Sequence, residues 1–175
     1  MSITRSALAG LATGGRTFSG IAALTATVPP GTTAEPDATL ARTGTQAALA
    51  LLASGEVVAD KLPFAPSRLE FPGIHGRIAF GAVCGVVIAR RSARYAPPEP
   101  GAPVVPGAPM APGRPGPVPP AHLVACAAVG AGAAWAGSVL GHRFRGWAAS
   151  RIGHDWIAAV LEDLAVAGLT SAAVG

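Results

Sequence analysis

Seven ionisable residues lie within long apolar runs or at their margins, and they are the residues whose chemistry most needs an explanation. They comprise three cations and four anions: Arg16, Glu56, Asp60, Lys61, Arg77, Glu162 and Asp163. A charge that faces lipid near a helix centre costs at least about 2.5–3.5 kcal/mol. Opposite charges that meet between helices offset this cost, so we expect the seven residues to form one polar cluster between membrane helices.

Helical spacing predicts how the four acids are shared. Glu56 and Asp60 are four residues apart and lie on one helix face, where like charges repel unless a cation lies between them or one carboxyl is protonated. Glu162 and Asp163 are adjacent, about 100° apart around a helix. They cannot both point at one partner, so we expect their helix to bridge two neighbours.

The expected partners of these acids are Arg16 and Arg77, because a guanidinium stays charged and offers five donors in a fixed fork. The cluster has two interpretations. In the structural one, buried ion pairs fix the register of the helices. In the functional one, the carboxylates exchange protons or bind a cation along a path, which is the default hypothesis for ionisable residues inside a membrane.

Motifs for other chemistry are absent from the sequence. There is no phosphate-binding loop, no GxSxG elbow and no HExxH, and the four histidines are scattered. No nucleophile–base pair supports covalent catalysis. The two cysteines lie in apolar runs and are expected to be small apolar fillers rather than a disulfide. We therefore predict that the chain is not an enzyme and holds no cofactor or metal.

Composition favours a membrane protein. Half of the 175 residues are hydrophobic and 13% are charged, about half the charged fraction of a soluble domain, and the mean hydropathy is +0.46. The 23 glycines would give a poor water-soluble core but allow close helix approach in lipid. Twelve of the 13 basic residues are arginines spread between apolar runs. This pattern argues against nucleic-acid binding and favours contact with anionic lipid.

Five apolar stretches are long enough to span a membrane by the usual lower limit of about 17 residues. They predict an all-α bundle of about five transmembrane helices, at about residues 3–28, 40–59, 73–89, 123–141 and 156–174. The first is interrupted by "GGRTFSG", which either breaks the helix, as in transporters, or belongs to a continuous glycine-rich helix. We favour the continuous helix. Arg16 also argues against a cleaved signal peptide.

The segments between these stretches divide the chain. Residues 92–121 hold eleven of the 17 prolines and predict an extended linker rather than a ligand for a partner domain. The linker separates a three-helix half (1–91) from a two-helix half (122–175) of one membrane domain. The stretch "DKLPFAPSR" predicts a tight hairpin loop, and "HRFRGWAASRIGHD" an interfacial connector anchored by Trp147 and Trp156. A lipid-headgroup site at this connector is a further hypothesis.

Small residues predict the helix contacts. Three GxxxG pairs would let backbones approach closely: Gly10 and Gly14, Gly81 and Gly85, and Gly137 and Gly141. The charge bias between the two sides is small. We prefer the linker inside and the N-terminus outside, and a dual-topology homodimer would also explain the small bias.

The pieces "VVADKLPFAPSR", "GGRTF" and "LEDLAVA" resemble a family of small bacterial membrane proteins, domain of unknown function 4126. The resemblance covers most of the chain outside the proline-rich linker, which is a departure from the family, as is Gly15. It implies a polytopic protein of a bacterial inner membrane with no established activity. The positions carried over are Asp60, Lys61, Pro63, Glu162 and Asp163.

The sequence therefore predicts a multi-pass protein of the cell membrane whose partners are the lipid bilayer and, as hypotheses, a second copy of the chain and a small solute or ion. Transport or permeation of that solute, with protonatable carboxylates at the core, is the leading functional hypothesis. The alternative is a non-catalytic scaffold or assembly subunit whose buried charges only fix helix packing.

Overall fold

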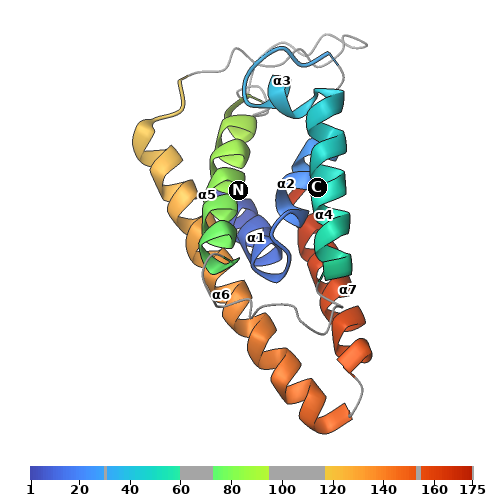
Figure 1. Cartoon of the computed structure of the whole chain (residues 1–175). Coiled ribbons are helices and arrows are strands. Elements are labelled where there is room, and N and C mark those ends of the chain that lie inside the picture. The colour runs from blue at the N-terminus through green and yellow to red at the C-terminus, as the bar shows by residue number, and fades with distance from the viewer. Residues whose placement is uncertain (30, 60–72, 95–116, 153–154, 175) are drawn as a thin grey trace, which may run out of the picture.

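The computed structural model describes residues 1–29, 31–59, 73–94, 117–152 and 155–174. Within this part of the chain all regular structure is α-helical, so the predicted all-α class is confirmed. Seven helices follow one another, and Figure 1 shows their arrangement: α1 (Ser2–Gly15), α2 (Ser19–Ala26), α3 (Asp37–Leu40), α4 (Thr43–Ala59), α5 (Gly73–Arg94), α6 (Pro120–Ile152) and α7 (Asp155–Val174).

Local chemistry accounts for several helix ends. Helix α6 begins at Pro120, a position where the missing proline N–H costs nothing because the first helical amides have no partner within the helix. Helix α5 ends with Arg91 and Arg94 in its last turn, where cations interact favourably with the helix dipole. Helix α1 ends at Gly14 and Gly15, the residues with the lowest helix propensity apart from proline.

Helices α1, α5 and α6 pack against one another along their glycines. A Cβ atom added to Gly81 would lie 2.5 Å from the Gly130 carbonyl oxygen, and one added to Gly137 would lie 2.5 Å from the Leu11 carbonyl oxygen. The other members of the predicted pairs in α1 and α5 also abut the α6 backbone. The GxxxG prediction of close helix contact is therefore confirmed for α1, α5 and the Gly137 end of the α6 pair.

These contacts also give the directions of the helices. We call the end of the bundle where α5 ends and α6 begins the upper end, and the end where α6 is followed by α7 the lower end (Figure 1). Gly10 lies against Gly130 and Gly14 lies against Ala134, so α1 runs parallel to α6. Gly81 lies against Gly130 and Gly85 against Cys126, so α5 is antiparallel to both.

The first apolar stretch is a helical hairpin, and our preference for one continuous helix was wrong. Arg16 is extended, with φ −141° and ψ 120°, and α2 then runs back along α1. A Cβ atom added to Gly20 of α2 would lie 2.5 Å from the Thr13 hydroxyl and 3.1 Å from the Ala9 carbonyl oxygen of α1. The chain therefore descends in α1, turns at residues 16–18 and climbs again in α2.

The hairpin changes the predicted topology. Near the start of α1, the Ser2 hydroxyl lies 2.9 Å from His122 Nε2 at the start of α6. Near the end of α7, Ala173 belongs to the same buried cluster as Leu24 and Leu40. Both ends of the chain therefore lie toward the upper end of the bundle, whereas five single spans would have placed them on opposite sides.

Other predicted boundaries also differ. The predicted connector "HRFRGWAASRIGHD" is helical as far as Ile152, because it forms the last part of α6, which is 33 residues long. The predicted linker overlaps helix at both of its ends, since α5 runs to Arg94 and α6 starts at Pro120. The rest of the proline-rich segment, residues 95–116, and the predicted "DKLPFAPSR" hairpin lie outside the described residues.

Two helices in the described part of the chain, α5 and α6, are long and apolar enough to cross a membrane by length and composition. A five-span bundle is not confirmed by this finding. Helix α6 also presents a row of large apolar side chains to the outside. Val124 is 68% exposed, Trp135 53% and Leu140 60%. Contiguous exposed apolar surface of this kind is typical of a membrane or protein interface.

Candidate functional site at the tip of the helical hairpin

The turn between α1 and α2 is where most of the predicted charged residues meet. We call residues 14–18, which connect the two helices, the hairpin tip. The end of α4, the start of α5 and the middle of α7 all contact it through ion pairs or hydrogen bonds. Of the seven predicted charged residues, five lie here; Asp60 and Lys61 lie outside the described residues.

Arg77 binds the end of α1 and the carboxylate of α4 at once. Its Nη1 donates to the carbonyl oxygens of Gly14 at 2.6 Å and Gly15 at 2.9 Å. Its Nη2 donates to Glu56 Oε1 at 3.0 Å. The last carbonyls of a helix have no partner within the helix and carry the negative end of its dipole. A buried cation at this position therefore stabilises the end of α1 directly.

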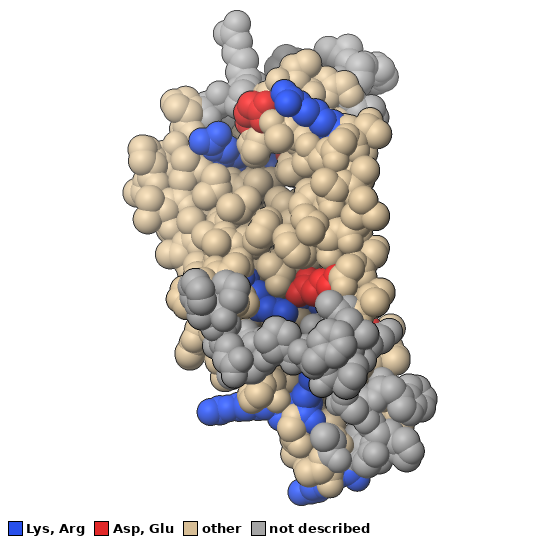
Figure 2. Space-filling view, in the orientation of Figure 1, with Lys and Arg blue, Asp and Glu red and all other residues tan. Residues whose placement is uncertain are grey.

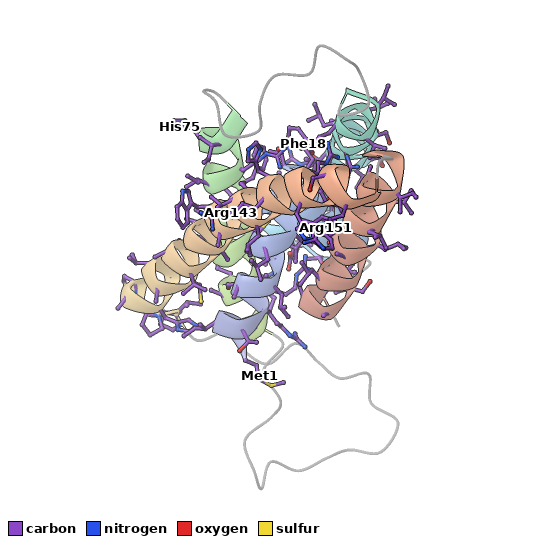
Figure 3. All side chains as sticks on the ribbon, turned by 90° about the horizontal axis from the view of Figure 1, so that it is seen from below. Met1, Phe18, His75, Arg143 and Arg151 are labelled. Atoms are coloured by element: carbon purple, nitrogen blue, oxygen red, sulfur yellow. The ribbon has the colours of Figure 1, made fainter. Side chains whose placement is uncertain are left out.

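Glu56 supplies a negative charge at the start of α2, as Arg77 supplies a positive charge at the end of α1. Its Oε1 accepts hydrogen bonds from both the amide and the hydroxyl of Thr17, each at 2.8 Å. Its Oε2 accepts from the Phe18 amide at 3.2 Å. These amides lead into the N-terminus of α2, where negative charge is favourable. The Arg77–Glu56 ion pair thus joins the two ends of the interrupted helix, one partner on each end. Phe18, whose amide donates to Glu56, is labelled in Figure 3.

The two acids of α7 are divided between two neighbours, as predicted. Asp163 Oδ1 accepts from Arg16 Nε at 2.8 Å and from Arg16 Nη2 as well. Glu162 Oε2 accepts from Arg145 Nε of α6 at 2.8 Å. Arg16 and Glu162 are 4% and 6% exposed as residues. The Asp163 side chain is 34% exposed, so it is the carboxylate with the most access to the outside.

The prediction that Arg16 and Arg77 are cations for these acids is confirmed for two of them, because Arg16 pairs with Asp163 and Arg77 pairs with Glu56. The partner missed from the sequence is Arg145. The sequence predicts a connector at Arg145, but α6 continues as a helix through this residue and brings it to the level of Glu162. The two residues are 17 positions apart on different helices. Their contact can be predicted only if α6 is known to remain helical as far as Arg145.

A second buried ion-pair cluster lies at the upper end and was not predicted. Asp37 at the start of α3 is fully buried. Its Oδ1 accepts from Arg91 Nη2 at 2.7 Å, and its Oδ2 accepts from Arg94 Nη1 at 3.1 Å. Arg91 also donates to the Leu24 carbonyl oxygen at 2.9 Å. These bonds attach α2 and α3 to the end of α5. These partners are 54 and 57 residues apart along the chain, so the sequence carries no local signal for this cluster.

A cavity of about 310 Å³ lies next to the hairpin tip, between α1, α6 and α7. Gly15 and Glu162 contribute to its wall, and most of its other lining residues are apolar. Within the described residues, no group of three or more His, Cys, Asp or Glu side chains is placed to hold a metal ion. Among the residues that the structure describes, the charged groups at the tip are three carboxylates paired with three arginines.

No family model, curated protein or solved structure matches the chain.

Proposed function

We propose that the chain is an integral membrane protein in which α1 and α2 form a re-entrant hairpin and the α7 carboxylates beside its tip exchange a proton or a small cation. The observation that carries the proposal is the placement of buried ion pairs at a helix interruption that the chain reaches and leaves from the same side. Non-helical backbone at membrane depth is tolerated where it is buried in protein or lines a polar cavity.

The lengths of the helices support this placement. Helix α1 has 14 residues, or about 21 Å at 1.5 Å per residue, against about 30 Å for the hydrocarbon core. Helix α7 has 20 residues, or about 30 Å. Its acids lie about 10 Å from its lower end, because they follow Asp155 by seven and eight residues. The ion-pair layer would then lie inside the hydrocarbon region, nearer the lower surface.

The distribution of charge is consistent with the same placement. Figure 2 shows charged side chains near the upper end and in the lower part of this face, with an uncharged band between them. In α5 the two levels are marked by Arg77 and Arg91, which are 14 residues or about 21 Å apart. The helix between them carries no charge except Arg90, directly beside Arg91.

The three carboxylates differ in their surroundings, and this difference supports different proposed roles. Glu56 is bonded to the Thr17 and Phe18 amides and to Arg77, so it is a fixed structural acceptor. Glu162 lines the cavity, and Asp163 is partly exposed. These two are the candidates for proton or cation exchange. Transporters often place such groups where a helix is interrupted.

The second candidate function is a non-catalytic scaffold, and a specific observation favours it. Among the described residues, the three carboxylates at the tip each have an arginine partner, and the glycines of α1, α5 and α6 bring the backbones of these helices into close contact. Under this hypothesis the ion pairs only hold the hairpin in place.

Proteoliposomes with an internal pH dye distinguish the two functions. We would impose a potassium diffusion potential and compare the wild type with Glu162→Gln, Glu56→Gln and Glu35→Gln, the last being an exposed acid. Exchange at α7 predicts a proton flux that Glu162→Gln abolishes without loss of folding, while Glu35→Gln leaves it unchanged. Absence of flux in the wild type across proton, sodium and potassium gradients would contradict exchange and support the scaffold.

A further inference from the structure

The cavity beside Glu162 is an apolar groove between α1, α6 and α7. Its walls include Leu140 and Phe144 of α6, Leu161 and Leu169 of α7, and Leu11 of α1. Glu162 also contributes to the wall, and its carboxylate is bonded to Arg145. From Leu161 to Leu169 the groove follows α7 for about 12 Å. Most of the residues along this length are apolar.

The same face of α6 continues below the groove and changes in character. Leu140, Phe144, Trp147 and Arg151 follow one another at spacings of four, three and four residues, which places them on one helix face. The Phe144 and Trp147 ring centroids are 6.1 Å apart. The Arg151 guanidinium carbon lies 6.0 Å from the Trp147 ring centroid. Over about 16 Å the face passes from aliphatic to aromatic to cationic.

The lower part of α6 carries an excess of positive charge. Residues 142–152 include three arginines and no acid. Arg145 is bonded to Glu162, whereas Arg143 and Arg151 are exposed and have no carboxylate partner among the described residues. Both are labelled on α6 in Figure 3, which views the molecule from below. Trp147, between them on the same face, is 53% exposed.

We propose that this groove binds an acyl chain of an anionic phospholipid and that Arg151, whose guanidinium lies against Trp147, binds its phosphate-bearing headgroup. The inference rests on the membrane placement proposed above. In that placement Arg151 lies at the level of the lower surface, since Arg145 pairs with Glu162 and Arg151 is six residues, or about 9 Å, further down. Tryptophan and arginine at this depth are typical membrane-interface residues.

The positive charge on the lower part of α6 favours an anionic lipid over a second copy of the chain as the molecule that binds this groove. A two-fold dimer brings the same patch of each subunit together, and here that would place arginines against arginines with no acid on this part of α6. An anionic headgroup complements them instead. An acyl chain also matches the chemistry of the site, because most of the residues that line the groove are apolar and Phe144, one of them, lies beside Trp147 on α6.

Quenching of Trp147 fluorescence by brominated lipid tests the proposal in the full-length protein. The other two tryptophans would be replaced, as Trp135→Phe and Trp156→Phe. The protein would be reconstituted in phosphatidylcholine vesicles that contain, at equal mole fraction, phosphatidylglycerol or phosphatidylcholine brominated at carbons 6 and 7. We expect stronger quenching by the brominated phosphatidylglycerol. Arg151→Gln should lower the relative affinity about fivefold, the ratio expected for one arginine near a headgroup.

Matched variants separate the site from general charge attraction. Arg90→Gln removes an exposed arginine at the upper end and should leave the preference unchanged. Ala165→Phe fills the groove and should lower the preference, whereas Ala167→Phe, on an exposed position of another face of α7, should not. Equal quenching by the two lipids, or equal effects of Arg90→Gln and Arg151→Gln, would overturn the lipid site. Failure of the protein to float with vesicles would overturn the membrane placement itself.

Discussion

The Arg77–Glu56 ion pair should hold the hairpin together, and replacing Arg77 with Met is the sharpest test of that role. The substitution keeps an unbranched apolar stem and removes the guanidinium, which donates to Gly14, Gly15 and Glu56. Hydrogen bonds to charged groups contribute about 1.5–3 kcal/mol each. Removal of one partner of a buried ion pair costs about 3–5 kcal/mol. These effects overlap, so we expect a loss of about 3–5 kcal/mol in the free energy of unfolding.

For a chain of this length, 1 kcal/mol shifts Tm by about 2–4 °C, so Arg77→Met should lower Tm by about 6–20 °C. Thermal unfolding in detergent, followed by far-ultraviolet circular dichroism, measures the shift. Arg90→Met is the matched control, because Arg90 is an exposed arginine of the same helix, and a surface change typically stays within about 0.5 kcal/mol. The double variant with Glu56→Gln should be less destabilised than the sum of the two single variants. Similar Tm values for Arg77→Met and Arg90→Met, or strict additivity, would refute the reasoning.

Three further predictions concern other contacts. Gly81→Ala should lower the free energy of unfolding by about 1–3 kcal/mol, because the added methyl group is overpacked against α6. Gly76→Ala, with no atom near the added methyl group, should raise it by about 0.5–1 kcal/mol. Chemical denaturation in detergent gives both values. Asp37→Asn should cost about 3–5 kcal/mol because it leaves the buried Arg94 and the partly buried Arg91 without their carboxylate, and Glu35→Gln nearby should cost little, as paired Tm measurements will show. Both cysteines are fully buried, so a maleimide should label them only after unfolding; rapid labelling of the native protein would contradict the packing of α5 and α6.

The features that the sequence predicts best are those set by composition and helical period. The glycine pairs of α1 and α5 could be found because small residues four apart lie on one face, and that face is where α6 packs. The division of Glu162 and Asp163 between two neighbours follows from the 100° between adjacent helical residues. Neither inference needs knowledge of the tertiary structure.

The features that the sequence does not show depend on the direction that the chain takes after a turn and on ion pairs between residues far apart in the sequence. A turn at Arg16 and a continuous helix through it have the same apolar composition, and only the contact of Gly20 with Thr13 makes the hairpin evident. Arg145 looked like part of a surface connector because charge and tryptophan are typical of membrane interfaces. Its pairing with Glu162 depends on α6 remaining helical well below the glycine-rich region.

The central claim is that the bundle lies in a membrane with α6 crossing it, and site-directed spin labelling of α6 tests this most directly. Single cysteines would replace Val124, Gly132 and Leu140, three exposed positions of α6, in a background with the two native cysteines changed to alanine. The ratio of collisions with oxygen to collisions with a water-soluble nickel chelate is measured in lipid vesicles. The account predicts a ratio that is highest at Gly132 and lower toward Val124, near the upper end. High nickel accessibility at all three positions would contradict a membrane-spanning α6.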